Sequence, residues 1–175
     1  MITTENVSLP RDFAADSRVW IYQANRPFTG AEADEARGLL DSFIAEWDSH
    51  GHPVKGFAGM FYNQFVVLVA DETATGVSGC STDSSVRLIR QLEDRTGVRL
   101  FDRLNLAFLV EGRVQLIPMT QLSSALEAGT ITGETAYFNN TVRTKQEFET
   151  DWLIPLKQSW LGSKHLHDCK AAPAK

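Results

Sequence analysis

The sequence predicts an α+β fold of the ferredoxin-like (split βαβ) type, in which an antiparallel sheet carries two helices on one face. Short runs rich in β-branched and aromatic residues at 19–23, 54–62, 64–70 and 106–110 have the composition of strands. Two longer segments with apolar residues at helical spacing lie between them. The order along the chain is therefore β-α-β-β-α-β, and another strand over 113–118 extends it.

The first helix is the most strongly patterned element. Thr29 and Glu32 have the spacing of a capping box. Apolar residues then recur at helical intervals, at Ala36, Leu39, Leu40, Phe43, Ile44 and Trp47. His50-Gly51 and Pro53 follow this pattern, so we expect the helix to end before them.

The middle of the chain predicts a hairpin followed by the second helix. Asn63 separates the two strands and is the expected turn residue. The run 65–69 is apolar without alternation, which is typical of a central strand covered on both faces. The second helix is expected over 82–95, with Gly97 placed to close it.

The last third of the chain predicts shorter elements. A helix is expected over 120–128 and a strand over 136–138. Thr144 and Glu147 repeat the capping-box spacing and open a short helix that Pro155 ends. We expect the resulting segment to pack on the sheet as an appendage.

These elements define the expected domain organisation. An N-terminal segment, 1–17, precedes a single α+β domain over 18–162. This domain divides into a core, 18–118, and the C-terminal appendage, 119–162. The tail over 163–175 is small and polar, so we expect it to be disordered.

Composition limits the classes of partner. The chain has 175 residues, a formal net charge of −5 and two cysteines. An acidic balance argues against a large nucleic-acid interface, and no apolar run is long enough to span a bilayer. The N-terminus does not have the pattern of a secretion signal. We therefore expect a cytoplasmic protein with reduced thiols that binds neither nucleic acid nor membrane.

The first candidate site lies where the loop over 71–79 meets the second helix. Small polar residues that open a helix leave main-chain N–H groups free, and such groups favour an anion or a thiolate. The predicted ligand-binding residues here are Gly79, Ser81, Thr82, Ser84 and Ser85. Our leading hypothesis is that they bind a small anionic ligand.

Two other hypotheses use the same segment differently. A cysteine-dependent enzyme would use Cys80 as nucleophile, Asp71 or Asp83 as orienting carboxylate, and His50 or His52 as base. A non-enzymatic interaction module would instead pair its sheet edge with a second copy in a homodimer, and the segment around Cys80 would be purely structural. A buried, inert thiol is the ordinary state of a cysteine in such a position.

A second group of polar residues follows the strand over 136–138. Asn139, Asn140 and Arg143 combine amides with a guanidinium near a helix start, a set that can recognise a carboxylate or phosphate. We expect them to close the anion site. The four tryptophans, Trp20, Trp47, Trp152 and Trp160, are expected to anchor the core and the appendage.

Several sharper motifs are missing from the sequence. The segment 76–80 lacks the last glycine of a G-x-S-x-G elbow, and no P-loop is present. His165, His167, Asp168 and Cys169 fit no structural zinc spacing. The sequence therefore predicts no metal site and indicates no particular cofactor.

Five segments together carry a resemblance to a known family. They are Val-Trp-Ile-Tyr-Gln-Ala-Asn-Arg-Pro at 19–27, Gly-Cys-Ser-Thr-Asp-Ser-Ser at 79–85, Phe-Asp-Arg at 101–103, Phe-Asn-Asn at 138–140 and Ser-Trp-Leu at 159–161. The chain resembles, over 18–161, an uncharacterised bacterial family whose members are often labelled "ABC transporter ATPase". The resemblance implies a cytoplasmic protein and brings no activity with it. An ATPase is not expected, because the Walker motif is missing.

Overall fold

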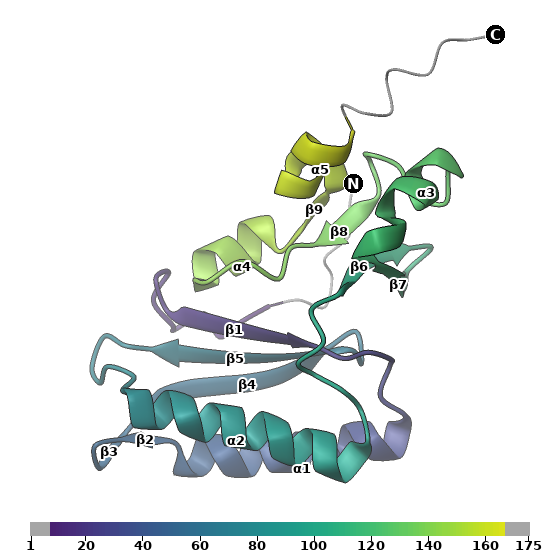
Figure 1. Ribbon diagram of the computed structural model, residues 1–175. Helices are drawn as coiled ribbons and strands as arrows, with labels where there is room; N and C mark the ends of the chain where they lie inside the picture. Colours follow the sequence, from purple (N-terminus) through teal and green to yellow (C-terminus); the bar gives the residue numbers. More distant parts are fainter. Residues whose placement is uncertain (1–7, 167–175) are drawn as a thin grey trace, which may run out of the picture.

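The computed structural model describes residues 8–166 of the chain, apart from the side chains of Cys80 and Ser81. Over this range the fold is mixed α/β, with five α-helices and open antiparallel sheets (Figure 1). None of the described helices combines the length and apolar character needed to cross a bilayer.

The first sheet is antiparallel and has the strand order β1-β5-β4. Its strands are β1 (Arg18–Gln23), β4 (Lys55–Phe61) and β5 (Phe65–Asp71). Every residue of β5 is buried, which confirms the prediction of a central strand covered on both faces. Asn63 has a positive φ in the turn between β4 and β5, as expected for the turn residue.

Two helices cover one face of this sheet, namely α1 (Gly30–Glu46) and α2 (Gly79–Thr96) (Figure 1). The predicted capping box of α1 is present, because Thr29 and Glu32 each accept a hydrogen bond from the other's main-chain N–H. Gly97 closes α2 with φ +67°, also as predicted. However, α2 starts three residues before the predicted residue 82, so Cys80 lies in its first turn.

The second sheet is also antiparallel and has the order β7-β6-β8-β9. Its strands are β6 (Asn105–Val110), β7 (Arg113–Pro118), β8 (Ala136–Phe138) and β9 (Leu153–Pro155). Glu111 and Gly112 both have positive φ between β6 and β7, the geometry of a tight hairpin turn. The appendage thus supplies two strands to the sheet that β6 and β7 begin.

This second sheet differs from the single sheet predicted from the sequence. A single ferredoxin-like sheet would place β6 beside β1, but β6 pairs with β7 along one edge and with β8 along the other. On the second edge β8 pairs with Phe108 and Leu109, and among the described residues the start of β6 bonds to β1 only through the side chain of Gln23. The sequence prediction contained strand 136–138 but not β9, and nothing in it indicated that 136–138 would compete for the edge of β6.

Shorter elements complete the fold: the strands β2 (Asp48–Ser49) and β3 (His52–Pro53), the helices α3 (Leu122–Glu127), α4 (Lys145–Asp151) and α5 (Trp160–His165), and the 3₁₀ turns η1 (Met119–Gln121) and η2 (Leu156–Gln158). Thr144 caps α4 as predicted. The small β2–β3 hairpin and α5 were not predicted. Residues 163–165 of the expected disordered tail are instead helical, as part of α5, and the tail from 167 onward lies outside the described residues.

The elements stack in four layers, with the two sheets in the middle. Val66 and Leu68 of β5 point into a core under α1 and α2. Val67 and Val69 point the other way, into a second core that includes Trp152, which lies between α4 and β9. The outer face of the second sheet packs on α3 and α5 in a third core. The polar side chains of Gln23 and Asn140 lie at the boundary between the two sheets.

Candidate functional site

The predicted anion site at the start of α2 uses much of its hydrogen-bonding capacity within the helix. The Thr82 hydroxyl donates to the carbonyl of Ser78 (3.1 Å), and the Ser85 hydroxyl donates to the carbonyl of Thr82 (2.7 Å). Ser84 accepts a hydrogen bond from the Arg87 guanidinium (2.8 Å). These hydroxyls therefore stabilise the first turns of α2. The side chains of Cys80 and Ser81, and with them the nucleophile hypothesis, lie outside the described part of the structure.

Asp71, a candidate orienting carboxylate, has a structural role at the end of β5. One carboxylate oxygen accepts bonds from the Thr73 hydroxyl (2.7 Å) and the Thr73 N–H, and the other from Lys55 Nζ (3.0 Å) and the Ala14 N–H. The Thr73 hydroxyl and the Lys55 ammonium hold the pKa of Asp71 well below its usual range, although burial opposes this. With both oxygens engaged, Asp71 fixes the turn after β5 and holds the segment before β1.

The other predicted catalytic groups are exposed. Asp83 lies on the surface of α2, and His50 and His52 lie in and beside the turn between β2 and β3. Within the described range, no group of three or more His, Cys, Asp or Glu side chains is placed to hold a metal ion.

Three of the predicted ligand-binding residues line a hollow, and they do not all line the same one. Ser84 lines a hollow between the end of α1 and the start of α2, together with Arg87 and the exposed sides of both helices. Asn140 and Arg143 line a different hollow, of about 430 Å³, in the space where β1 and β6 lie without pairing. We call the second hollow the β1–β6 cleft. Leaving aside Cys80 and Ser81, whose side chains are not described, no residue of 79–85 belongs to its lining, so these two groups do not share a hollow.

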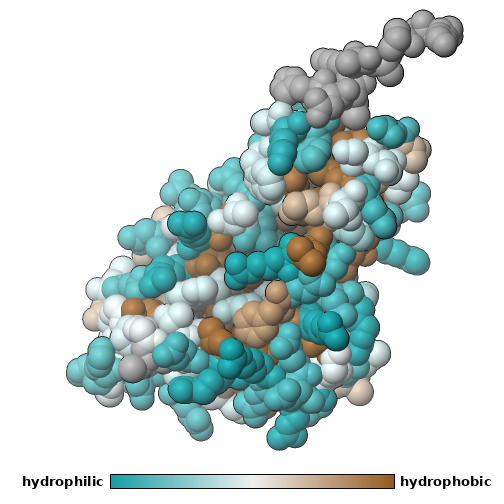
Figure 2. All heavy atoms as spheres, in the orientation of Figure 1, coloured by the Kyte–Doolittle hydropathy of each residue, from teal (hydrophilic) through white to brown (hydrophobic). Residues whose placement is uncertain are grey.

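The β1–β6 cleft has strand β1 on one side and the segment 100–107 on the other. Residues 140–143 close it along a third side, and Trp160 of α5 lies at its rim. Hydrophobic side chains reach the surface in this part of the molecule, between the two sheets (Figure 2). The cleft is therefore built from both halves of the fold.

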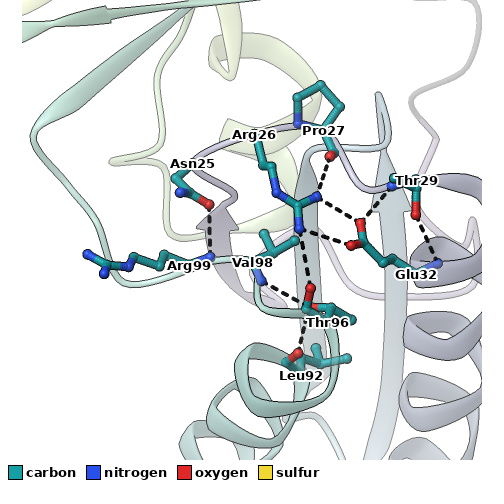
Figure 3. A network of polar contacts seen from close by, with 9 residues as sticks. All are labelled: Asn25, Arg26, Pro27, Thr29, Glu32, Leu92, Thr96, Val98 and Arg99. Atoms are coloured by element: carbon teal, nitrogen blue, oxygen red, sulfur yellow. Dashed lines mark hydrogen bonds and ion pairs between the residues drawn. The ribbon is translucent and has the colours of Figure 1, made fainter.

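One end of the cleft is fixed by hydrogen bonds between the ends of β1 and α2. The Asn25 N–H donates to the carbonyl of Arg99 (2.9 Å). The Arg99 N–H in turn donates to Asn25 Oδ1 (2.9 Å) (Figure 3). Next to them, the Arg26 guanidinium donates to both carboxylate oxygens of Glu32 (2.8 and 2.9 Å) and to the Thr96 carbonyl (3.3 Å). This network attaches the segment that starts at residue 99 to the end of β1.

The same network changes the acidity of Glu32. Hydrogen bonds from Arg26, followed by one from the Thr29 N–H, lower the pKa of Glu32 from 4.5 to about 2. Glu32 therefore stays charged over the pH range in which most proteins are studied, and the network at this end of the cleft stays intact there.

The floor of the cleft is a chain of amide hydrogen bonds. Gln23 Nε2 donates to the carbonyl of Asn105 in β6 (2.9 Å). Gln23 Oε1 accepts from Asn140 Nδ2 (2.8 Å), and Asn140 Oδ1 accepts from the indole N–H of Trp152 (2.9 Å). Asn140 thus holds the site together, with both ends of its amide engaged. The other predicted amide, Asn139, bonds through its oxygen to the Thr141 hydroxyl (2.6 Å).

The rim of the cleft is unusually apolar. In the described structure, the large apolar side chains classed as exposed are Phe101, Leu104, Met119 and Trp160. Three of these four line the cleft, and Trp160 is 48% exposed although the tryptophans were expected to anchor the core and the appendage. Single exposed apolar side chains are normal, but their concentration around one hollow is typical of a binding site.

The charges on the rim are mainly positive. Arg103 and Arg143 line the cleft, and neither guanidinium forms an ion pair with another described residue. The one carboxylate in the lining, Asp102, accepts from the Leu104 N–H and from Asn105 Nδ2. An acidic protein thus presents two unpaired cations in one hollow, which favours an anionic group.

Sequence reasoning found part of this site. Asn140 and Arg143 were predicted as ligand-binding residues, whereas Gln23, Phe101, Arg103, Met119 and Trp160 were not. Their common property is that they border β1 and β6, and this property depends on which strands pair.

A scan of protein-family models, a search of curated proteins and a search of solved structures each found no match to this chain.

Proposed function

We propose that the protein binds, in the β1–β6 cleft, a ligand that carries an anionic group beside an apolar one, and that it does so without ATPase activity. The observation that carries this proposal is the coincidence of three exposed apolar side chains and two unpaired arginines around one hollow of about 430 Å³. Ligand sites are typically concave and apolar, with a few polar groups that fix orientation.

The start of α2 is a weaker candidate for the same function. Its Thr82 and Ser85 hydroxyls already bond to carbonyls of the chain, and Ser84 bonds to Arg87. The hollow that contains Ser84 also presents Glu46 and Asp48, which disfavour an anion. The cleft is therefore the better-supported place for the predicted anionic ligand.

The proposal includes a view of how the cleft arises. We interpret the chain as a ferredoxin-like, split βαβ arrangement in which the fourth strand, β6, belongs to a second sheet instead of pairing with the edge of β1. The order β1-β5-β4 with α1 and α2 on one face supports this view. The cleft then occupies the position that the fourth strand would fill. A cytoplasmic location, as expected from the composition, belongs to the same proposal.

The dye 8-anilinonaphthalene-1-sulfonate (ANS) tests the proposal, because it joins a sulfonate to aromatic rings. We expect the folded protein to bind one ANS per chain with enhanced fluorescence. The double variant Arg103→Gln, Arg143→Gln should bind the dye about tenfold more weakly, since each exposed charge contributes up to about 1 kcal/mol. Trp160→Ala should also weaken binding.

The matched control is Arg87→Gln, which removes a cation from the hollow between α1 and α2 and should leave ANS binding unchanged. Circular dichroism of every variant checks that it is folded. Equal ANS affinity in the wild type and in the double arginine variant would show that the β1–β6 cleft is not the binding site.

A further inference from the structure

The outer edge of β1 carries unpaired main-chain groups inside the cleft. In an antiparallel strand, successive residues point their N–H and C=O groups alternately to the two sides. The N–H of Val19 points away from β5, because it donates to the carbonyl of Arg143 (2.8 Å). The main-chain groups of Ile21 and Gln23 therefore point to the same side. No main-chain partner is found for them there within residues 8–166.

The unpaired stretch is bounded at both ends by other segments that bond to the same edge. An antiparallel bridge joins Arg18 to Thr144 at one end. The Asn25 N–H bonds to the carbonyl of Arg99 at the other. Between these contacts about four residues of β1 are open, which is roughly 13 Å of strand at about 3.3 Å per residue.

β6 does not pair with this edge of β1. Strands in a sheet lie about 4.8 Å apart and bond directly through their main chains. Here the Gln23 side chain, not the main chain, spans the distance from β1 to the Asn105 carbonyl of β6. The main-chain groups of Ile21 and Gln23 on this side are therefore not bonded to the main chain of β6.

We propose that the ligand is an extended peptide segment of another protein, an inference that rests on the proposed function. The peptide pairs with β1 as an added strand and places an acidic group next to Arg103 and Arg143. A peptide main chain supplies the alternating donors and acceptors that the free groups of Ile21 and Gln23 require. Its apolar side chains contact the exposed Phe101, Met119 and Trp160. A small anion would satisfy the arginines but leave the strand edge unpaired.

A second copy of the chain fits this position poorly. The free edge of β1 lies between two walls, the segments 100–107 and 140–143. The β1 edge of another copy would lie equally deep between its own walls, so two such edges could not approach to hydrogen-bonding distance. A single extended segment without walls of its own can enter.

Selection from a phage-displayed heptapeptide library tests the inference. The full-length protein is immobilised and bound phage are eluted with ANS, which restricts the selection to peptides that compete for the dye's site. We expect enriched sequences that alternate apolar and acidic residues. The synthetic peptides should bind Arg103→Gln, Arg143→Gln about tenfold more weakly than wild type. They should bind the control Arg87→Gln equally well.

Amide exchange measured by NMR tests the strand pairing itself. A bound peptide should slow exchange of the Ile21 N–H at least tenfold and leave that of Trp20, which faces β5, nearly unchanged. Peptides N-methylated at the bonding amides should lose binding. Peptide binding without protection of Ile21 would overturn strand addition.

The remaining outcomes separate the two proposals. If ANS binds in the cleft but the selection enriches no acidic, apolar sequences, the peptide inference is wrong and the proposed function stands. If ANS binding does not depend on the cleft arginines, the proposed function itself fails. A dimer in sedimentation velocity that the double arginine variant dissociates would identify a second copy as the occupant and overturn the inference.

Discussion

Replacement of Asn140 by alanine should destabilise the protein by about 2–4 kcal/mol. The side chain makes two hydrogen bonds that join three parts of the fold, one to Gln23 (2.8 Å) and one from the indole of Trp152 (2.9 Å). Each such bond contributes about 1 kcal/mol net. Trp152 is 1% exposed, so its N–H would have no access to water, which adds about 1–2 kcal/mol within the usual range for an orphaned group.

Urea unfolding followed by circular dichroism measures this change directly. For a chain of this size it corresponds to a fall in melting temperature of roughly 4–16 °C. Trp152→Phe removes the donor of the same bond. The double variant with Asn140→Ala should therefore lose about 1 kcal/mol less than the sum of the two single changes, because the indole bond is counted twice in that sum.

The neighbouring Asn139 provides the matched control. Within the described residues its side chain bonds to the exposed Thr141 hydroxyl and to no buried group. Asn139→Ala should change the free energy of unfolding by at most about 1 kcal/mol. If Asn140→Ala costs no more than Asn139→Ala, the amide chain does not support the floor of the cleft and our account of this site is wrong.

Three further predictions test other features. In the free protein, NMR should show faster amide exchange at Ile21 than at Trp20, because only the latter bonds to β5; equal rates would contradict the open edge. Glu32 has a pKa lowered to about 2, so its contribution to stability is complete above about pH 4.5 and is lost as pH falls towards 2. The stability difference between wild type and Glu32→Gln should therefore shrink between pH 6 and pH 3 in urea titrations, and a constant difference would refute the coupling. Gly162→Ala should lower the free energy of unfolding by about 1–3 kcal/mol, because the new methyl group would collide with the preceding backbone turn. Gly38→Ala, on an open side of α1, should raise it by about 0.5–1 kcal/mol in the same assay. The opposite order of the two effects would contradict the packing of α5.

Local patterns in the sequence predicted local structure well. The capping box at Thr29 and the buried run of β5 depend on residues close together in the chain, and both are present. The partners of β6 could not be predicted this way. Its composition suits a strand beside either neighbour, and the choice depends on β8, which follows 25 residues after β6 ends and is only three residues long. The cleft was missed for the same reason, because it exists only when β6 pairs away from β1.

The two-sheet arrangement has a consequence for how the chain folds during synthesis. Each sheet is built from one continuous stretch, β1 to β5 for the first and β6 to β9 for the second. The first sheet and its two helices can therefore form on the ribosome before the second half of the chain has emerged. Until then, Val67 and Val69 lack the cover that the second sheet provides. The N-terminal half alone is thus expected to be the stage of biogenesis at which chaperones bind most readily.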